Sequence, residues 1–246
     1  MVAFIFSYIA VFTDFIYNYI MTPMNSIIVN WSGEDKKALE SIASRISAEL
    51  NDVLKMGDRP PLTITIHDSR DSYEKRLNKK TETWEVGNAS RDGQIDILHP
   101  DAFEKYSTHK KGEFSSILKH EVVHVYLRAL AEDHYIPHWL NEGLANYLTH
   151  QEGSHGELAP LFIESNFTTK LSSGYDWDAR VKYGAYLLAR LFTKYLIDKF
   201  TFDKVIELVK DLDKNFYEPS FRTKFRNHFN VDLSEAENSF VMEINK

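Results

Sequence analysis

Cysteine is absent from this 246-residue chain, so disulfide bonds and metal sites built from thiolates are excluded. A chain without disulfides fits a reducing compartment, but many secreted bacterial proteins also lack cysteine. The sequence therefore leaves the localisation open, with a cytoplasmic and a membrane-associated position as the two alternatives.

The chain also has no excess of positive charge. The 36 acidic residues outnumber the 29 lysines and arginines and give a net charge of −7. Because a protein that binds nucleic acid needs a basic surface to neutralise phosphates, nucleic acid is not expected as a partner. Two basic clusters are interpreted as solvated helix faces: Lys75, Arg76, Lys79 and Lys80, and Arg222, Lys224 and Arg226.

Internal repeats, low-complexity tracts and long linkers are absent as well. A chain of this length can bury the core of one domain with two lobes. We therefore expect one folded unit over residues 25–246, divided into an α/β lobe (25–113) and a helical lobe that binds the metal (114–246).

One long apolar run does occur, at residues 1–21, where Asp14 is the only charged residue. Its length approaches that of a membrane span, but the positive charge that opens a signal peptide is missing. Three interpretations of residues 1–24 stay open: a membrane anchor or export signal, a packed amphipathic helix, and a start assigned too early. The third interpretation is open because sequence typical of a folded domain begins at Asn25. Membrane association through residues 1–21 is one of these alternatives.

Residues His120–His124 read HEVVH within a segment that favours a helix. From 114 to 131 the apolar residues keep helical spacing, and no glycine or proline interrupts them. His120 and His124 should therefore lie one turn apart on the same face, where two imidazoles can bind one metal ion. Glu121 would lie beside that metal, free to accept a proton from metal-bound water.

A catalytic zinc ion needs a third protein ligand, and Glu142 is the best candidate. Pro137 cannot continue the first helix, and the apolar spacing after it predicts a second helix with Glu142 in its first turn. A second helix that folds back across the first would bring this carboxylate to the two histidines. Asn146, one turn further along, could accept a hydrogen bond from a metal-bound imidazole.

The other histidines near the motif are not expected to bind the metal. The chain has ten histidines, so a chance pair at this spacing is unremarkable, whereas the pair with its glutamate and an acidic third ligand is much rarer. Because zinc already has its ligands, we assign His134, His138 and His150 to loops or the surface.

Short strands are predicted in the first half of the chain and long helices in the second. The predicted strands are 27–31, 62–67 and a strand or hairpin at 87–98, and the predicted helices are 34–55, 71–77 with Ser69 as its cap, 114–131, the segment after Pro137, and 179–200. This order indicates the fold class α+β, with a small mixed sheet below and the helices that carry the metal above.

Together these motifs resemble the gluzincin clan of zinc metallopeptidases, in particular peptidase MA-like domains. The resemblance is carried by HEVVH at His120–His124 and by WLNEGLANY at Trp139–Tyr147. Weaker matches in the family's order extend it from Asn25 to the C-terminus: Pro61–Asp68, Val86–Ala89, Gly93–Ile97, Tyr195–Phe200 and Phe225–Phe240. It implies a zincin-like fold with an active-site helix and a helical C-terminal lobe, and peptide or protein substrates. It also implies zinc held by His120, His124 and Glu142.

The resemblance further implies a tyrosine that stabilises the oxyanion. In related gluzincins this tyrosine opens a helix, nine residues before an aromatic or apolar residue that leucine follows. Tyr186 stands nine residues before Tyr195 and Leu196, with Ala189 where the aminopeptidases carry glycine. Tyr183 is the alternative. A phenol at either position can donate a hydrogen bond to the developing oxyanion.

The edge strand bears on the mode of cleavage. The clan's aminopeptidases anchor the substrate amine with an acidic residue in a Gly-x-Met-Glu-Asn motif on this strand. The corresponding residues here, Gly87–Ser90, read GNAS and contain no carboxylate. An endopeptidase is therefore expected, and an exposed strand edge can bind an extended peptide through main-chain hydrogen bonds.

We therefore expect a zinc-dependent peptidase in which Glu121 is the general base on zinc-bound water. Two alternatives remain, a non-catalytic zinc-bearing binding module and a membrane-associated protein with a vestigial site. Both are disfavoured by Glu121, because a structural zinc site has no use for a free carboxylate beside its metal.

Overall fold

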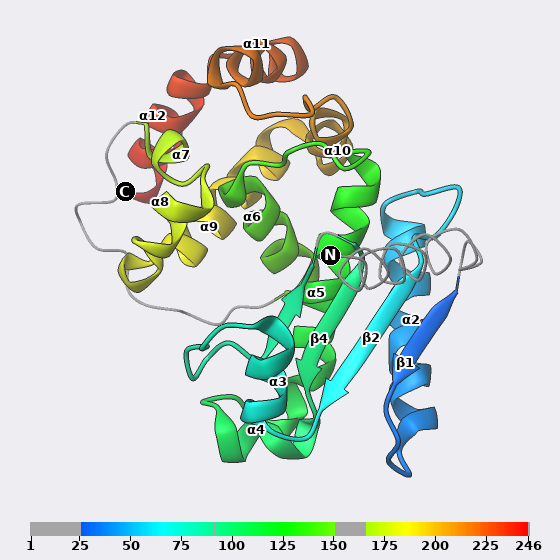
Figure 1. Cartoon of the computed structure of the whole chain (residues 1–246). Helices are drawn as coiled ribbons and strands as arrows, with labels where there is room; N and C mark the ends of the chain where they lie inside the picture. The colour runs from blue at the N-terminus through cyan, green and yellow to red at the C-terminus, as the bar shows by residue number, and fades with distance from the viewer. Residues whose placement is uncertain (1–25, 91, 151–165, 246) are drawn as a thin grey trace, which may run out of the picture.

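The computed structural model describes residues 26–90, 92–150 and 166–245 (Figure 1). The apolar run at residues 1–21 lies outside the described residues, and so do the three interpretations of the N-terminus. Within the ranges that the structure describes, no helix combines the length and hydropathy needed to cross a membrane.

A four-stranded mixed sheet forms the lower part of the molecule in Figure 1. Its strands, in spatial order, are β1 (Ile27–Asn30), β2 (Leu62–His67), β4 (Gln94–Leu98) and β3 (Gly87–Ala89). The first three are parallel, whereas β3 runs antiparallel to β4 and forms one edge. Of the two alternatives for 87–98, a single strand or a hairpin, the structure shows the hairpin. Gly93, with its φ of 77°, adopts the left-handed conformation that the turn between β3 and β4 requires.

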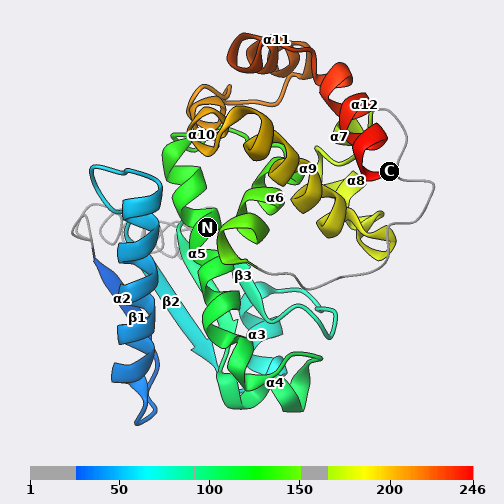
Figure 2. The ribbon, with the colours of Figure 1, turned by 180° about the vertical axis from the view of Figure 1, so that it is seen from behind.

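Two helices lie side by side across one face of the sheet, α2 (Lys36–Val53) and α5 (Phe114–Leu130), as Figure 2 shows. The buried apolar residues of α2 recur at helical spacing because only one side of this helix meets the core: Leu39, Ala43, Ile46 and Leu50. In contrast, α5 is buried at every position from Glu121 to Leu127. It contacts β3 and β4 as well as α6, so it joins the sheet to the helices above it.

The remaining elements are short helices beside the sheet and a group of helices above it. They are α3 (Arg70–Leu77), α4 (Pro100–Tyr106), α6 (His138–Thr149), α7 (Phe167–Lys170), α8 (Gly174–Asp178), α9 (Ala185–Phe200), α10 (Phe202–Lys210), α11 (Glu218–Phe229) and α12 (Leu233–Ile244), with 3₁₀ turns η1 (Lys111–Glu113) and η3 (Val181–Tyr183). Ser69 caps α3 as predicted, since its side chain accepts a hydrogen bond from the Ser72 amide. The predicted α+β class is confirmed, while the division at residue 113 stays a prediction.

The helix predicted over 179–200 begins later than expected, at Ala185. Gly184 has a φ of 91°, a left-handed conformation that no α-helix continues through, and a 3₁₀ turn precedes it. Tyr183 and Tyr186 therefore lie on different elements and not on neighbouring faces of one helix.

Helices α6 and α9 pack unusually closely, and Gly143 is the reason. A Cβ atom at this position would overlap Thr193 Oγ1 and lie 2.6 Å from the carbonyl oxygen of Ala189, both on α9. Only glycine fits this approach. Because Gly143 directly follows Glu142, the packing of α6 on α9 also fixes the position of that carboxylate.

Candidate active site

Helix α5 places His120 and His124 together, as their spacing predicts. The ring centroids are 4.7 Å apart and the ring planes are inclined by 82°. Both side chains are largely buried, with exposed fractions of 12% and 10%. Two imidazoles are therefore held one helical turn apart, with most of their surface covered by protein.

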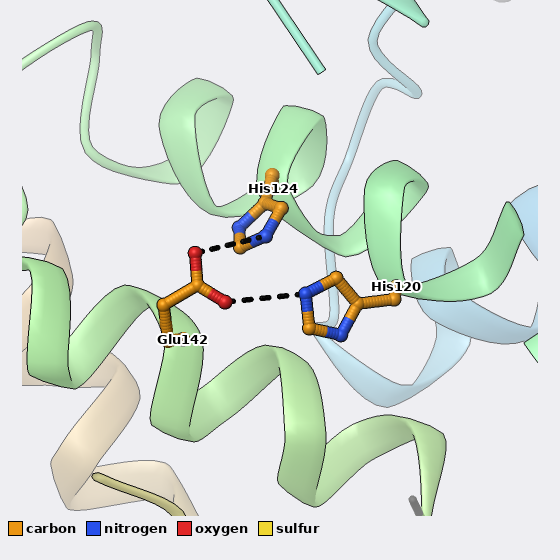
Figure 3. Close-up of side chains that lie close together, drawn as sticks. All are labelled: His120, His124 and Glu142. Carbon is orange, nitrogen blue, oxygen red and sulfur yellow. Dashed lines mark hydrogen bonds and ion pairs between the residues drawn. The ribbon is translucent and has the colours of Figure 1, made fainter. Parts of the chain in front are cut away.

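Helix α6 brings Glu142 to this pair (Figure 3). Glu142 Oε2 lies 3.2 Å from His120 Nε2, and Glu142 Oε1 lies 3.5 Å from His124 Nε2. One correction concerns the helix start: α6 begins at His138, directly after Pro137, so Glu142 is its fifth residue and not in the first turn. The carboxylate nevertheless points between the two rings.

The residues His120, His124 and Glu142 fit a zinc ion. One nitrogen or oxygen atom from each lies within 4.8 Å of the others, and no other such group occurs among residues 26–90, 92–150 and 166–245. Two imidazole nitrogens and one carboxylate oxygen are a ligand set that catalytic zinc accepts, with one position left for substrate or water. Nδ1 of both histidines is buried without a hydrogen-bond partner, so Nε2 is the nitrogen that each ring directs at the shared centre.

Glu142 and His120 shift each other's pKa. Burial alone would raise the pKa of Glu142, but His124 and His120 outweigh it and hold that pKa at about 2. Burial would likewise lower the pKa of His120, yet the Glu142 carboxylate raises it above its usual value. The site therefore presents an ionised carboxylate that a cation can bind in place of the imidazole proton.

Glu121 lies next to the ligand group without belonging to it. The side chain is buried and points toward the edge strand, where a Cβ atom on Gly87 would lie 3.0 Å from its Oε1. Burial raises the pKa of Glu121, while His120, His124 and a hydrogen bond from the Ala89 backbone oppose that rise. A carboxylate beside a metal, outside its ligand set and with a raised pKa, is suited to accept a proton.

A cavity of about 1190 Å³ opens over this group. Its walls come from both parts of the molecule: the segment before β3 and β3 itself on one side, and the segments around α6, α8 and η3 on the other. His120, Glu121, His124 and Glu142 all line it. The cavity is large enough for several residues of an extended peptide.

Tyr186 lines the cavity, whereas Tyr183 does not. Tyr186 lies in the first turn of α9, and its ring packs edge to face on Trp177 (4.9 Å) and Trp84 (6.1 Å). Burial raises the pKa of Tyr186 well above its usual value, so the phenol keeps its proton. Tyr183 is 41% exposed because it belongs to η3 and not to α9.

The hydrogen bond predicted for Asn146 is not formed. Asn146 is buried on α6 and lines the cavity, but Nδ1 of His120 and of His124 has no partner, and Asn146 Nδ2 has none either. Each imidazole directs Nε2 at Glu142 on α6. The amide lies near the site without a hydrogen bond to either imidazole Nδ1, and its role beside a bound metal stays a prediction.

The assignment of His138 to a loop or the surface is wrong. His138 is the first residue of α6 and lines the cavity, and its Nδ1 is buried without a partner. His134 also lines the cavity, but its Nδ1 donates to the Leu212 carbonyl, and His150 is exposed as predicted. The sequence did carry a signal for this position: His138 stands four residues before Glu142, so on one helix the two side chains share a face.

Comparison with protein families gives a match over residues 86–227 to the BSP family, described as peptidase of plants and bacteria. Comparison with curated proteins gives no match. The matched segment covers more than half of the chain and contains His120, Glu121, His124, Glu142 and Tyr186. The chain therefore belongs to this family of peptidases of plants and bacteria.

Proposed function

We propose that the protein is a zinc-dependent peptidase of the gluzincin type, in which His120, His124 and Glu142 hold the metal. Membership of a peptidase family supports hydrolysis of peptide bonds and a peptide or protein substrate. The convergence of the Glu142 carboxylate on two imidazoles carries the proposal of a metal. We propose that residues 25–246 form one peptidase domain, with the lobes 25–113 and 114–246 on the two sides of the cleft.

Glu121 is the general base in this proposal. A zinc ion bound by the three ligands would polarise the scissile carbonyl and activate the attacking water at neutral pH. Glu121 accepts the proton of that water at its carboxylate and passes it to the nitrogen of the leaving amine. Burial supports this role, because it raises the pKa of Glu121 toward the range in which a carboxylate can both accept and return a proton.

Tyr186 is the proposed oxyanion donor. Its phenol stays protonated, lies in the cavity and is held between two tryptophan rings, so its position is fixed before substrate arrives. A donor placed in advance stabilises the negative charge on the carbonyl oxygen without reorganisation. Tyr183 is the weaker candidate because it does not line the cavity.

The edge strand supports endopeptidase action. β3 (Gly87–Ala89) contributes no carboxylate to the cavity, and Glu85, just before it, is engaged with Lys79 at 2.8 Å. A free substrate amine would therefore find no carboxylate on β3 to bind it. As the outermost strand of the sheet, β3 can instead bind the main chain of an internal peptide segment.

Metal removal and readdition test the proposal. A chelator should abolish cleavage of a protein substrate, and one equivalent of zinc should restore it. His120→Ala, His124→Ala and Glu142→Ala should each lose stoichiometric zinc, while His150→Ala, at an exposed position outside the cavity, should keep it. Stoichiometric zinc in all three ligand variants would refute the site.

A further inference from the structure

His138 occupies a distinctive place in the cleft. It lies one turn before Glu142 on α6, so the two side chains project from the same face of this helix toward the cavity. His120, His124 and Glu142 line the same cavity as His138. The imidazole is therefore close to the ligand group, although it is not one of the three residues whose ligand atoms converge.

The surroundings of His138 leave one ring nitrogen for a ligand. Nδ1 is buried without a partner, and among the described residues no hydrogen bond to Nε2 is formed. A Cβ atom on Gly174 would lie 3.3 Å from Nε2 and 3.7 Å from Cε1. A side chain at position 174 would therefore press against this edge of the ring, and glycine avoids that contact.

Trp177 connects His138 to the proposed oxyanion donor. The ring centroids of His138 and Trp177 are 6.1 Å apart, and Trp177 packs on Tyr186 at 4.9 Å. Trp177 is itself buried. One fixed tryptophan thus supports two polar side chains that both line the cavity.

From this arrangement we infer that His138 is a substrate-binding residue, which donates a hydrogen bond from Nε2 to a main-chain carbonyl of the peptide in the cleft. The inference rests on the proposed peptidase function, because it takes a peptide as the ligand. A main-chain carbonyl is the partner that fits. An imidazole N–H beside an anionic carboxylate and a metal site favours a neutral acceptor that every peptide carries, whatever its side chains.

The test measures binding and not turnover. In a Glu121→Gln background loaded with zinc, the dissociation constant of acetyl-hexaalanine amide is compared between His138, His138→Gln and His138→Phe. Gln can place an N–H near the position of Nε2, whereas Phe fills the same space without a donor. His138→Phe should weaken binding by about threefold to tenfold, the loss of one neutral hydrogen bond. The dissociation constant of His138→Gln should stay within about twofold of that of the parent, because glutamine keeps the hydrogen-bond donor.

Controls separate a role of His138 in peptide binding from a role in folding or in zinc binding. His150→Phe should leave binding unchanged, and zinc content and melting temperature should match the parent in all variants. If His138→Phe does not fold, His138→Asn, whose shorter side chain withdraws the donor, takes its place. Unchanged affinity without the donor, equal loss with Gln and Phe, loss of zinc, or no binding by the parent would each overturn the inference. Hydrolysis by the wild type is measured separately, since an inert protein that binds peptide through His138 would refute only the peptidase function.

Discussion

Gly87 on the edge strand and Glu121 on α5 are in direct contact. A Cβ atom on Gly87 would lie 2.9 Å from Glu121 Cγ and 3.0 Å from Oε1, closer than side chains tolerate. The strand that is proposed to bind the substrate therefore also limits the position of the proposed base. Glycine permits this approach because it has no side chain.

Gly87→Ala should displace the Glu121 carboxylate while the three ligands stay in place. Misplacement of a reacting group by a fraction of an ångström to one ångström lowers the rate by up to about 100-fold, so we expect a fall of about 10- to 100-fold in kcat/KM. Zinc content should not change. Gly112→Ala is the matched control, because a Cβ atom there meets nothing within 4 Å. Equal activity of the two variants would show that this contact does not position the base.

Gly143→Ala should destabilise the protein, although alanine favours helices more than glycine by about 0.8–1.0 kcal/mol. The added methyl group meets Thr193 and the Ala189 carbonyl on α9, and backbone cannot yield as a flexible side chain does. Overpacking of this kind costs about 1–3 kcal/mol, so the net change in the free energy of unfolding should be unfavourable. Urea denaturation measures it, with Gly57→Ala, in open space, as control.

Tyr186→Phe should lower kcat by about 10²- to 10³-fold, the typical effect of removing one oxyanion donor. Its zinc content and melting temperature should stay at the wild-type values. Tyr183→Phe should leave kcat unchanged, since that ring is outside the cavity lining and 41% exposed. Unchanged kcat in both variants would remove tyrosine from the mechanism.

Blocked peptides should be cleaved as readily as unblocked ones. No carboxylate on β3 is available to bind a free amine, and the nearest on the preceding segment, Glu85, pairs with Lys79. Mass spectrometry of the products should show internal cleavage at early times. Release of single N-terminal residues, with acetylated peptides resistant, would instead indicate an aminopeptidase.

Local periodicity was sufficient to predict the elements that carry the ligands. The spacing of His120 and His124 places them on one helix face, and proline before α6 marks its start. Ser69 as a cap and the hairpin over 87–98 follow from equally local rules. Each of these features depends on residues within about one or two turns of each other.

Features that depend on a second element could not be predicted in this way. The left-handed Gly184 separates Tyr183 from α9, but apolar spacing alone continued the helix through it. The absence of a hydrogen bond between Asn146 and an imidazole Nδ1 depends on how α6 crosses α5. The place of His138 in the cavity depends on α8, which packs beside the start of α6.

The central claim is that a metal held by His120, His124 and Glu142 works with Glu121 to hydrolyse peptide bonds. Its most direct test is one paired measurement of zinc content and protein hydrolysis in the wild type and in Glu121→Gln. We predict one zinc per chain in both, and a loss of activity by at least about 100-fold in the variant, because general-base catalysis contributes about 10²- to 10⁴-fold. Hydrolysis by Glu121→Gln at the wild-type rate, or a wild type that cleaves without bound metal, would contradict the account.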